Sequence, residues 1–166
     1  MKNKIIVLSI ILLFIALIGI LVYGGENKVD AKIPTINTHL KSGDSEYNSA
    51  VTSLNNKKYS DAQTSSENAL NEFKKAKETA QDALISSTDG NNTVIQKYIQ
   101  DTISEIDLKI SATNELSSGI RSVSTNPSEA NQHFTKSNDL MKQSLEIKTQ
   151  RKQTEKENPS IFQNIN

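Results

Sequence analysis

Cysteine is absent from this chain of 166 residues, and so is tryptophan. Without cysteine the chain can form no disulfide, offer no thiolate to a metal and carry no lipid on a cysteine behind a signal sequence. Packing alone must therefore hold the fold. A lipoprotein and an enzyme with a cysteine nucleophile are both excluded.

An excess of charge of either sign is also missing, because the chain has 19 basic and 19 acidic residues. Lys2 and Lys4 precede a long apolar run, so 17 basic and 19 acidic residues follow it, a net charge of about −2. Binding of nucleic acid relies on basic surfaces that neutralise phosphates. We therefore expect no nucleic-acid partner.

Motifs of site chemistry are scarce. His39 and His133 have no carboxylate three or four residues further on, and the six glycines form no phosphate-binding loop. Pairs of opposite charge four residues apart, such as Glu105 with Lys109, are typical of solvated helix faces. We expect no enzyme activity, no metal and no cofactor.

The long apolar run covers residues 5–23, which include no charged side chain. As a helix this run would rise about 28 Å, which matches the core of a bilayer. Its length favours a retained signal-anchor over a cleaved signal peptide, for which the best cleavage motif would be the poor stretch 22–24. Lys2 and Lys4 place the N-terminus in the cytoplasm. Whether the run is cut off stays open.

The chain is accordingly divided into five parts. We expect a cytoplasmic stub at 1–4, a transmembrane helix at 5–23, a linker at 24–33, an extracytoplasmic helical bundle at 34–157 and a C-terminal tail at 158–166. The expected location is the cell membrane, crossed once, with most of the chain on the outer side.

The outer part is predicted to be all-α, an elongated antiparallel bundle of three to four helices. Four segments repeat apolar or small residues at alternating spacings of four and three, the pattern of packed helices. Gly43 and Asp44 weaken the first segment, so its helix begins either near Pro34 or near Asp44. The expected buried positions are Ile36, Leu40, Gly43, Tyr47, Ala50 and Leu54; Ala62, Ser66, Ala69, Phe73, Ala76, Ala80 and Ala83; Ile95, Ile99, Ile103 or Thr102, Ile106, Ile110, Thr113, Ser117 and Ile120; and Ala130, Phe134, Ser137, Met141 and Leu145 or Ser144.

Capping chemistry separates these segments. The stretches 60–63 and 93–96 match the capping box that opens a helix. Asn126 before Pro127 is another typical helix start, and Pro159 is expected to end the last helix. The alanine-rich second segment faces the isoleucines of the third, which predicts an antiparallel pair.

A similarity within the chain also indicates an internal repeat. The stretch 60–62, with Ala69 seven residues later, resembles the stretch 128–130, with Ser137 seven residues later, at an offset of 68 residues.

Two groups of residues are candidate sites. Asn91 begins an Asn-Asn-Thr acceptor pattern for N-glycosylation in a predicted turn, for which the alternative is a plain polar turn. Lys148, Arg151, Lys152 and Lys156 cluster late in the last helix, which an up-down-up-down order returns to the membrane. Anionic headgroups would attract such a cluster. The alternative is an ordinary solvated helix end.

Two functions fit these features. The first is a membrane-anchored interaction or tethering module without catalysis, which binds a protein partner or a second copy of the chain, because long helices offer extended faces to partner helices. The alternative is an extracytoplasmic bundle that binds or senses a small ligand and acts through a partner protein.

Overall fold

The computed structural model describes residues 29, 31–87 and 92–162. The elements are four long helices, α1 (Lys32–Asn55), α2 (Tyr59–Ser87), α3 (Thr93–Ser122) and α4 (Pro127–Glu157), and the single turn α5 (Pro159–Phe162). No strand occurs within those ranges. The predicted all-α fold built from four long helices is confirmed.

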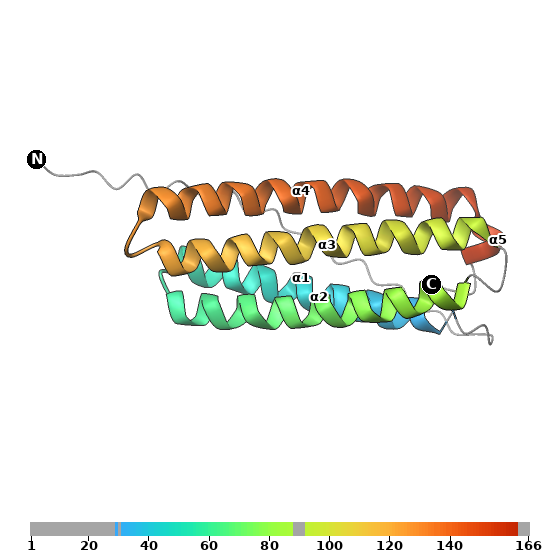
Figure 1. Cartoon of the computed structure of the whole chain (residues 1–166), viewed down its shortest axis with the longest axis horizontal. Coiled ribbons are helices and arrows are strands. Elements are labelled where there is room, and N and C mark those ends of the chain that lie inside the picture. Colours follow the sequence, from blue (N-terminus) through green and yellow to red (C-terminus); the bar gives the residue numbers. More distant parts are fainter. Residues whose placement is uncertain (1–28, 30, 88–91, 163–166) are drawn as a thin grey trace, which may run out of the picture.

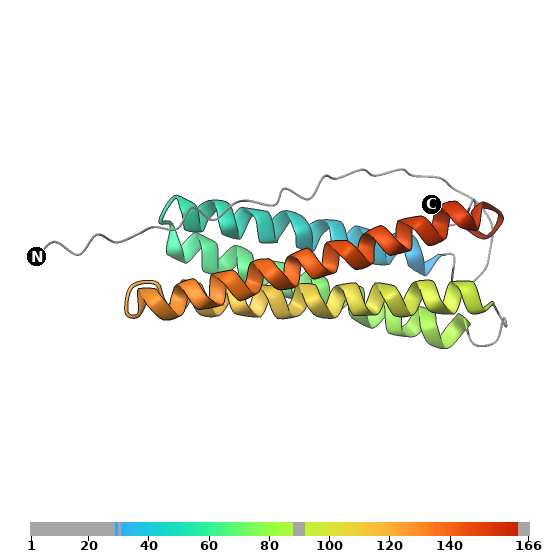
Figure 2. The same cartoon turned by 90° about the horizontal axis from the view of Figure 1, so that it is seen from above.

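Successive helices run in opposite directions and lie side by side along the bundle (Figure 1). α1 packs along α2, α3 packs along α4, and the two hairpins meet mainly where α2 lies against α3. Figure 2 shows α4 crossing the bundle at an angle. One end, here called the turn end, holds the turns at 56–58 and 123–126. The opposite, terminal end holds the start of α1 and the end of α4.

The predicted transmembrane helix at 5–23, the stub at 1–4 and most of the linker at 24–33 lie outside the described residues. Among the helices that the structure does describe, none has both the length and the hydropathy that crossing a membrane requires.

Every position expected to be buried in α1 and α2 is buried. α1 begins at Lys32 and continues unbroken through Gly43 and Asp44, so the alternative start near Asp44 is wrong. Both residues make contacts in the core. The ring of Phe73 packs against the Cα of Gly43, and the carboxylate of Asp44 binds Lys109. The two residues that weaken the sequence pattern thus each have a buried partner.

α3 buries more of its surface than the sequence predicts. The isoleucine seam is buried as expected, except that Ile110 and Ser117 are only partly buried. Of the two alternatives Ile103 and Thr102, Thr102 is the buried residue. A second stripe of α3 is buried as well, because this helix packs against both α2 and α4. That stripe consists of Tyr98, Thr102, Glu105, Lys109, Ala112, Leu116 and Gly119.

The caps predicted for α2 and α3 are wrong. α2 begins one residue before Ser60, and the side chain of Gln63 donates to Ser117 of α3 at 2.9 Å instead of closing a capping box. α3 is capped by Asn92 rather than Thr93, since the Asn92 side chain accepts hydrogen bonds from the backbone two and three residues further on. At the start of α2 the Gln63 side chain is bound by Ser117, and at the start of α3 the backbone N–H groups are bound by Asn92, so neither capping box forms.

The start of α4 is confirmed, with Pro127 as its first residue and Asn126 as its cap. The Asn126 side chain accepts from the backbone N–H of Glu129 at 3.3 Å. Replacing Asn126 with Ala leaves that donor without its partner, so we expect a loss of about 1 kcal/mol of unfolding free energy. Urea denaturation followed by circular dichroism measures it. Asn131→Ala, at an exposed position inside α4, is the control, and an equal loss there would contradict the assignment of the cap.

The start of the predicted C-terminal tail is helical and packs against the bundle. α4 ends at Glu157, before Pro159, as predicted, but residues 159–162 form α5 and fold back onto the bundle. Phe162 is 2 % exposed. Its ring centroid lies 4.9 Å from that of Tyr98, with the rings tilted by 51°. The first part of the tail therefore belongs to the core.

Candidate functional site

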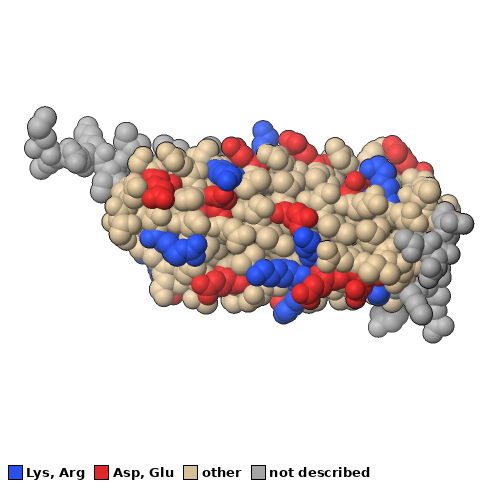
Figure 3. Space-filling view, in the orientation of Figure 1, with Lys and Arg blue, Asp and Glu red and all other residues tan. Residues whose placement is uncertain are grey.

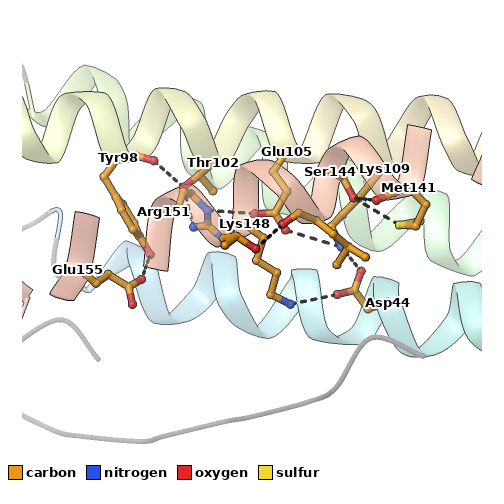
Figure 4. A network of polar contacts seen from close by, with 12 residues as sticks. Asp44, Tyr98, Thr102, Glu105, Lys109, Met141, Ser144, Lys148, Arg151 and Glu155 are labelled. Atoms are coloured by element: carbon orange, nitrogen blue, oxygen red, sulfur yellow. Dashed lines mark hydrogen bonds and ion pairs between the residues drawn. The ribbon is translucent and has the colours of Figure 1, made fainter. Parts of the chain in front are cut away.

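Four charged side chains are buried where α1, α3 and α4 meet (Figure 4). We call this group, Asp44, Glu105, Lys109 and Arg151, the buried charge network. Their exposed fractions are 3, 1, 0 and 5 %. Two acids and two bases are present, so the network is neutral as a whole. Charges this deep are tolerated only when they are paired and hydrogen-bonded.

Lys109 stands at the centre of the network. Its ammonium donates to Asp44 of α1 and lies 3.7 Å from Oε1 of Glu105, one turn earlier on α3. The ring of Phe73 from α2 approaches the same ammonium, with 5.6 Å between Nζ and the ring centroid. A cation over an aromatic face is attracted by the ring quadrupole. Lys109 therefore contacts two other helices, α1 and α2, as well as the preceding turn of α3.

Arg151 holds the other side of Glu105. Its Nε and Nη2 lie 3.0 Å and 2.7 Å from Oε2 of Glu105, and Nη1 donates to Thr102 at 2.8 Å. Burial, the largest single effect, lowers the pKa of Arg151, but Glu105 together with Tyr98 and Glu155 outweighs burial, so the pKa is raised. The guanidinium also stacks 5.0 Å from the ring of Tyr98. Arg151 is thus a fixed positive charge inside the bundle.

Two further groups line the rim of the network. Tyr98 donates its hydroxyl proton to Glu155 at 2.7 Å, and burial raises the pKa of this tyrosine. Nζ of Lys148 lies 3.9 Å from Asp44, and the side chain remains 27 % exposed. Burial lowers the pKa of Lys148, an effect that the Asp44 carboxylate partly opposes.

The four basic residues predicted to contact headgroups differ in their exposure to solvent. Arg151 is bound to Glu105 inside the bundle, so the expectation of a surface base is wrong there, and Lys148 is turned towards Asp44. Lys152 and Lys156 are exposed. These two exposed lysines are therefore the ones left for the headgroup hypothesis. They are on the last part of α4, which lies at the terminal end beside the start of α1 (Figure 1).

Glu105 and Lys109, expected on a solvated face, are buried, which corrects that prediction. The comparable pair Lys74 and Glu78 is exposed, as expected. A signal for the difference exists in the sequence, because the second stripe of α3 continues the spacings of four and three on both sides of Glu105. The predicted glycosylation residue Asn91 lies outside the described residues.

His39 and His133 are partly buried, and each bonds a glutamate of the neighbouring helix. Nδ1 of His39 lies 2.8 Å from Glu72, and Nδ1 of His133 lies 2.6 Å from Glu115. A lysine also contacts each glutamate, at 2.7 Å and 2.6 Å. Over the described ranges, no three acidic or histidine side chains are placed to hold a metal.

Hydrogen bonds from the lysine and then from the histidine lower the pKa of Glu72 and of Glu115 below 4.5. A lowered folded-state pKa contributes stability that is complete above pH 4.5 and is lost as the pH falls through the folded value. We expect Glu72→Gln combined with Glu115→Gln to lose less stability on acidification than the unchanged chain. Urea denaturation at neutral pH and below pH 4.5 measures the difference, and parallel losses in both proteins would refute it.

A polar hollow lies between α1 and α2, and no residue of the buried charge network lines it. It is lined by Ser42, Ser45, Glu46, Asn68, Asn71, Glu72 and Lys75. Hydroxyl, amide and charged groups suit a small polar molecule better than an apolar one.

The charged groups of the network bond to one another, so the arrangement joins α1, α3 and α4 and neutralises charge inside the bundle. Such a role is structural and needs no proton transfer to a substrate. Comparison of the chain with protein-family models, with curated protein sequences and with solved structures gives no match.

Proposed function

We propose that this protein is a membrane-anchored, extracytoplasmic helical module that binds or tethers a protein partner and catalyses no reaction. The observation that carries the proposal is the position of the apolar run at 5–23, shortly before a rod of four helices that begins at Lys32. A run of this length suits the bilayer core. The rod of four helices suits a role as a spacer between the membrane and a bound partner.

The arrangement of the helix ends supports the proposal. With the apolar run in a membrane, the terminal end of the bundle would face the membrane, and the turn end would stand farther out by the length of α1. That helix has 24 residues and spans about 36 Å at 1.5 Å per residue. Basic and acidic side chains are interspersed over the face seen in Figure 3, so a partner would be recognised by local contacts rather than by one strong field.

Tyr59 is the best single contact for such a partner. It lies at the turn end, directly after the first turn, and is 39 % exposed. Tyrosine is enriched among the residues that dominate protein interfaces, because it buries a large surface at a small entropic cost.

A photo-crosslinking amino acid at Tyr59, in the full-length protein with a C-terminal tag, tests the proposal in cells. The same amino acid at Ser160, exposed at the terminal end, is the control. We expect one reproducible envelope protein at the first position, none at the second, and an N-terminal peptide that still contains residues 5–23. A processed protein with no partner at either position would refute the tether.

The alternative function, a small-ligand-binding or sensing bundle, is favoured by the polar hollow between α1 and α2. A ligand there would raise the melting temperature with increasing concentration above its dissociation constant. Free amino acids and neutral sugars are the probes. Asn68→Ala combined with Asn71→Ala should abolish any specific shift, and a shift that persists in this variant would exclude the hollow as the site.

A further inference from the structure

The two hairpins of the bundle resemble each other in their buried pattern. Six buried positions of α2 recur in α4 at the offset of 68 residues. They are 62, 66, 69, 73, 76 and 83 in α2, and 130, 134, 137, 141, 144 and 151 in α4. Small side chains occupy many of these positions in both helices. The apolar pattern alone therefore distinguishes poorly between one hairpin and the other.

The buried charges do distinguish the hairpins. Within the described residues, the α1–α2 hairpin buries one charged side chain, Asp44, and the α3–α4 hairpin buries Glu105, Lys109 and Arg151. Glu105 and Arg151 neutralise each other within their own hairpin. One hairpin is thus left with one buried negative charge, on Asp44, and the other with one buried positive charge, on Lys109.

The contact between Asp44 and Lys109 is where these two charges meet across the hairpin interface. Other polar contacts cross the same interface. The hydrogen bond of 2.7 Å between Tyr47 and Ser137 is uncharged, and the ion pairs Lys77–Asp107 and Lys148–Asp44 have basic partners that are partly exposed to solvent. An unpaired buried charge is far more costly than an unpaired hydroxyl. The charged pair is therefore the contact that a wrong pairing of hairpins would miss most.

We propose that the Asp44–Lys109 pair selects the pairing of the hairpins: it makes the α1–α2 hairpin accept the α3–α4 hairpin in one register and reject a second copy of itself. Two α1–α2 hairpins placed face to face would bury two carboxylates without a cation. Two α3–α4 hairpins would bury two Lys109 ammonium groups without the Asp44 carboxylate, an excess of two positive charges. A shift of one heptad in the correct pair would separate Asp44 from Lys109 by about 10 Å along the helix axis.

The test compares two double variants that each remove one acid and one base. Asp44→Val with Lys109→Met removes the unbalanced charge of both hairpins, whereas Glu105→Met with Arg151→Met leaves it in place. Both variants are made in the full-length protein in detergent, with spin labels on cysteines at Thr52 and Thr135, two exposed positions on α1 and α4. The natural chain has no cysteine, so labelling is specific.

For the first variant we expect retained helix content together with a second label–label distance, shifted by about 10 Å, or species of higher mass in light scattering. For the second variant we expect the single distance and the mass of the unchanged protein. Equal behaviour of the two variants would overturn the proposal. Loss of helix content in the first variant would also overturn it, because the pair would then be needed for stability rather than for selection.

Discussion

Lys109→Met is expected to lower the free energy of unfolding by about 3–5 kcal/mol, the usual effect of removing one partner from a buried ion pair. The ammonium of Lys109 is fully buried and serves both Asp44 and Glu105. Without it, the cation that the described residues still place near Asp44 is the partly exposed Lys148, with 3.9 Å between the charged atoms. A buried carboxylate would then remain without a close cation.

The double variant Asp44→Val with Lys109→Met separates the two effects. It removes the carboxylate together with its cation, so we expect it to be more stable than Lys109→Met alone and close to the unchanged protein. Urea denaturation with a fitted m-value for each variant is the measurement. A double variant as unstable as the single one would show that lost packing, rather than an unpaired charge, causes the effect.

Phe73→Ala is expected to be similarly severe, at about 3–5 kcal/mol, because a fully buried ring is replaced by a cavity. Phe73 is 0 % exposed and packs so closely on Gly43 that a Cβ at position 43 would clash with the ring. In the unchanged chain, Gly43→Ala should therefore cost about 1–3 kcal/mol through overpacking. The core can accommodate either the ring or a methyl group at this place.

The two substitutions should be strongly non-additive. In the Phe73→Ala background, Gly43→Ala has room and gains up to about 1 kcal/mol of helix propensity, so its effect should change sign. Thermal and urea unfolding of the four proteins in this double-mutant cycle measure the coupling. Gly119→Ala, facing Phe134 nearer the turn end, is a comparison at a ring that is 8 % exposed. A cost of Gly43→Ala that is unchanged without the ring would refute the steric explanation.

The helices and most of the core could be predicted from the sequence, because apolar and small residues at spacings of three and four report directly on the buried face. The seam from Ile36 to Leu54 and that from Ala62 to Ala83 are buried as expected. The pattern indicates which residues of one helix face inward. It does not indicate what they meet there, so Gly43 looked like an interruption although its missing side chain makes room for Phe73.

The buried charge network could not be predicted, for a related reason. Glu105 and Lys109 match the pattern of a solvated pair, and an isolated charge inside a core is unfavourable. Only partners from other helices make the burial acceptable, and Asp44 is 65 residues away from Lys109 in the chain. Periodicity within a single helix contains no information about such partners. The continued stripe from Tyr98 to Gly119 was the available sign that this face of α3 lies inside.

The sequence separation between Asp44 and Lys109 also has a kinetic consequence. Contacts within each hairpin join residues close in the chain and form early, whereas a contact across 65 residues requires closure of a long loop. The pair should therefore form after the folding transition state. Breaking the pair by Lys109→Met is expected to raise the rate of unfolding and leave the rate of folding nearly unchanged, which stopped-flow measurements would resolve. On this view the buried pair governs how long the folded bundle lasts more than how fast it forms.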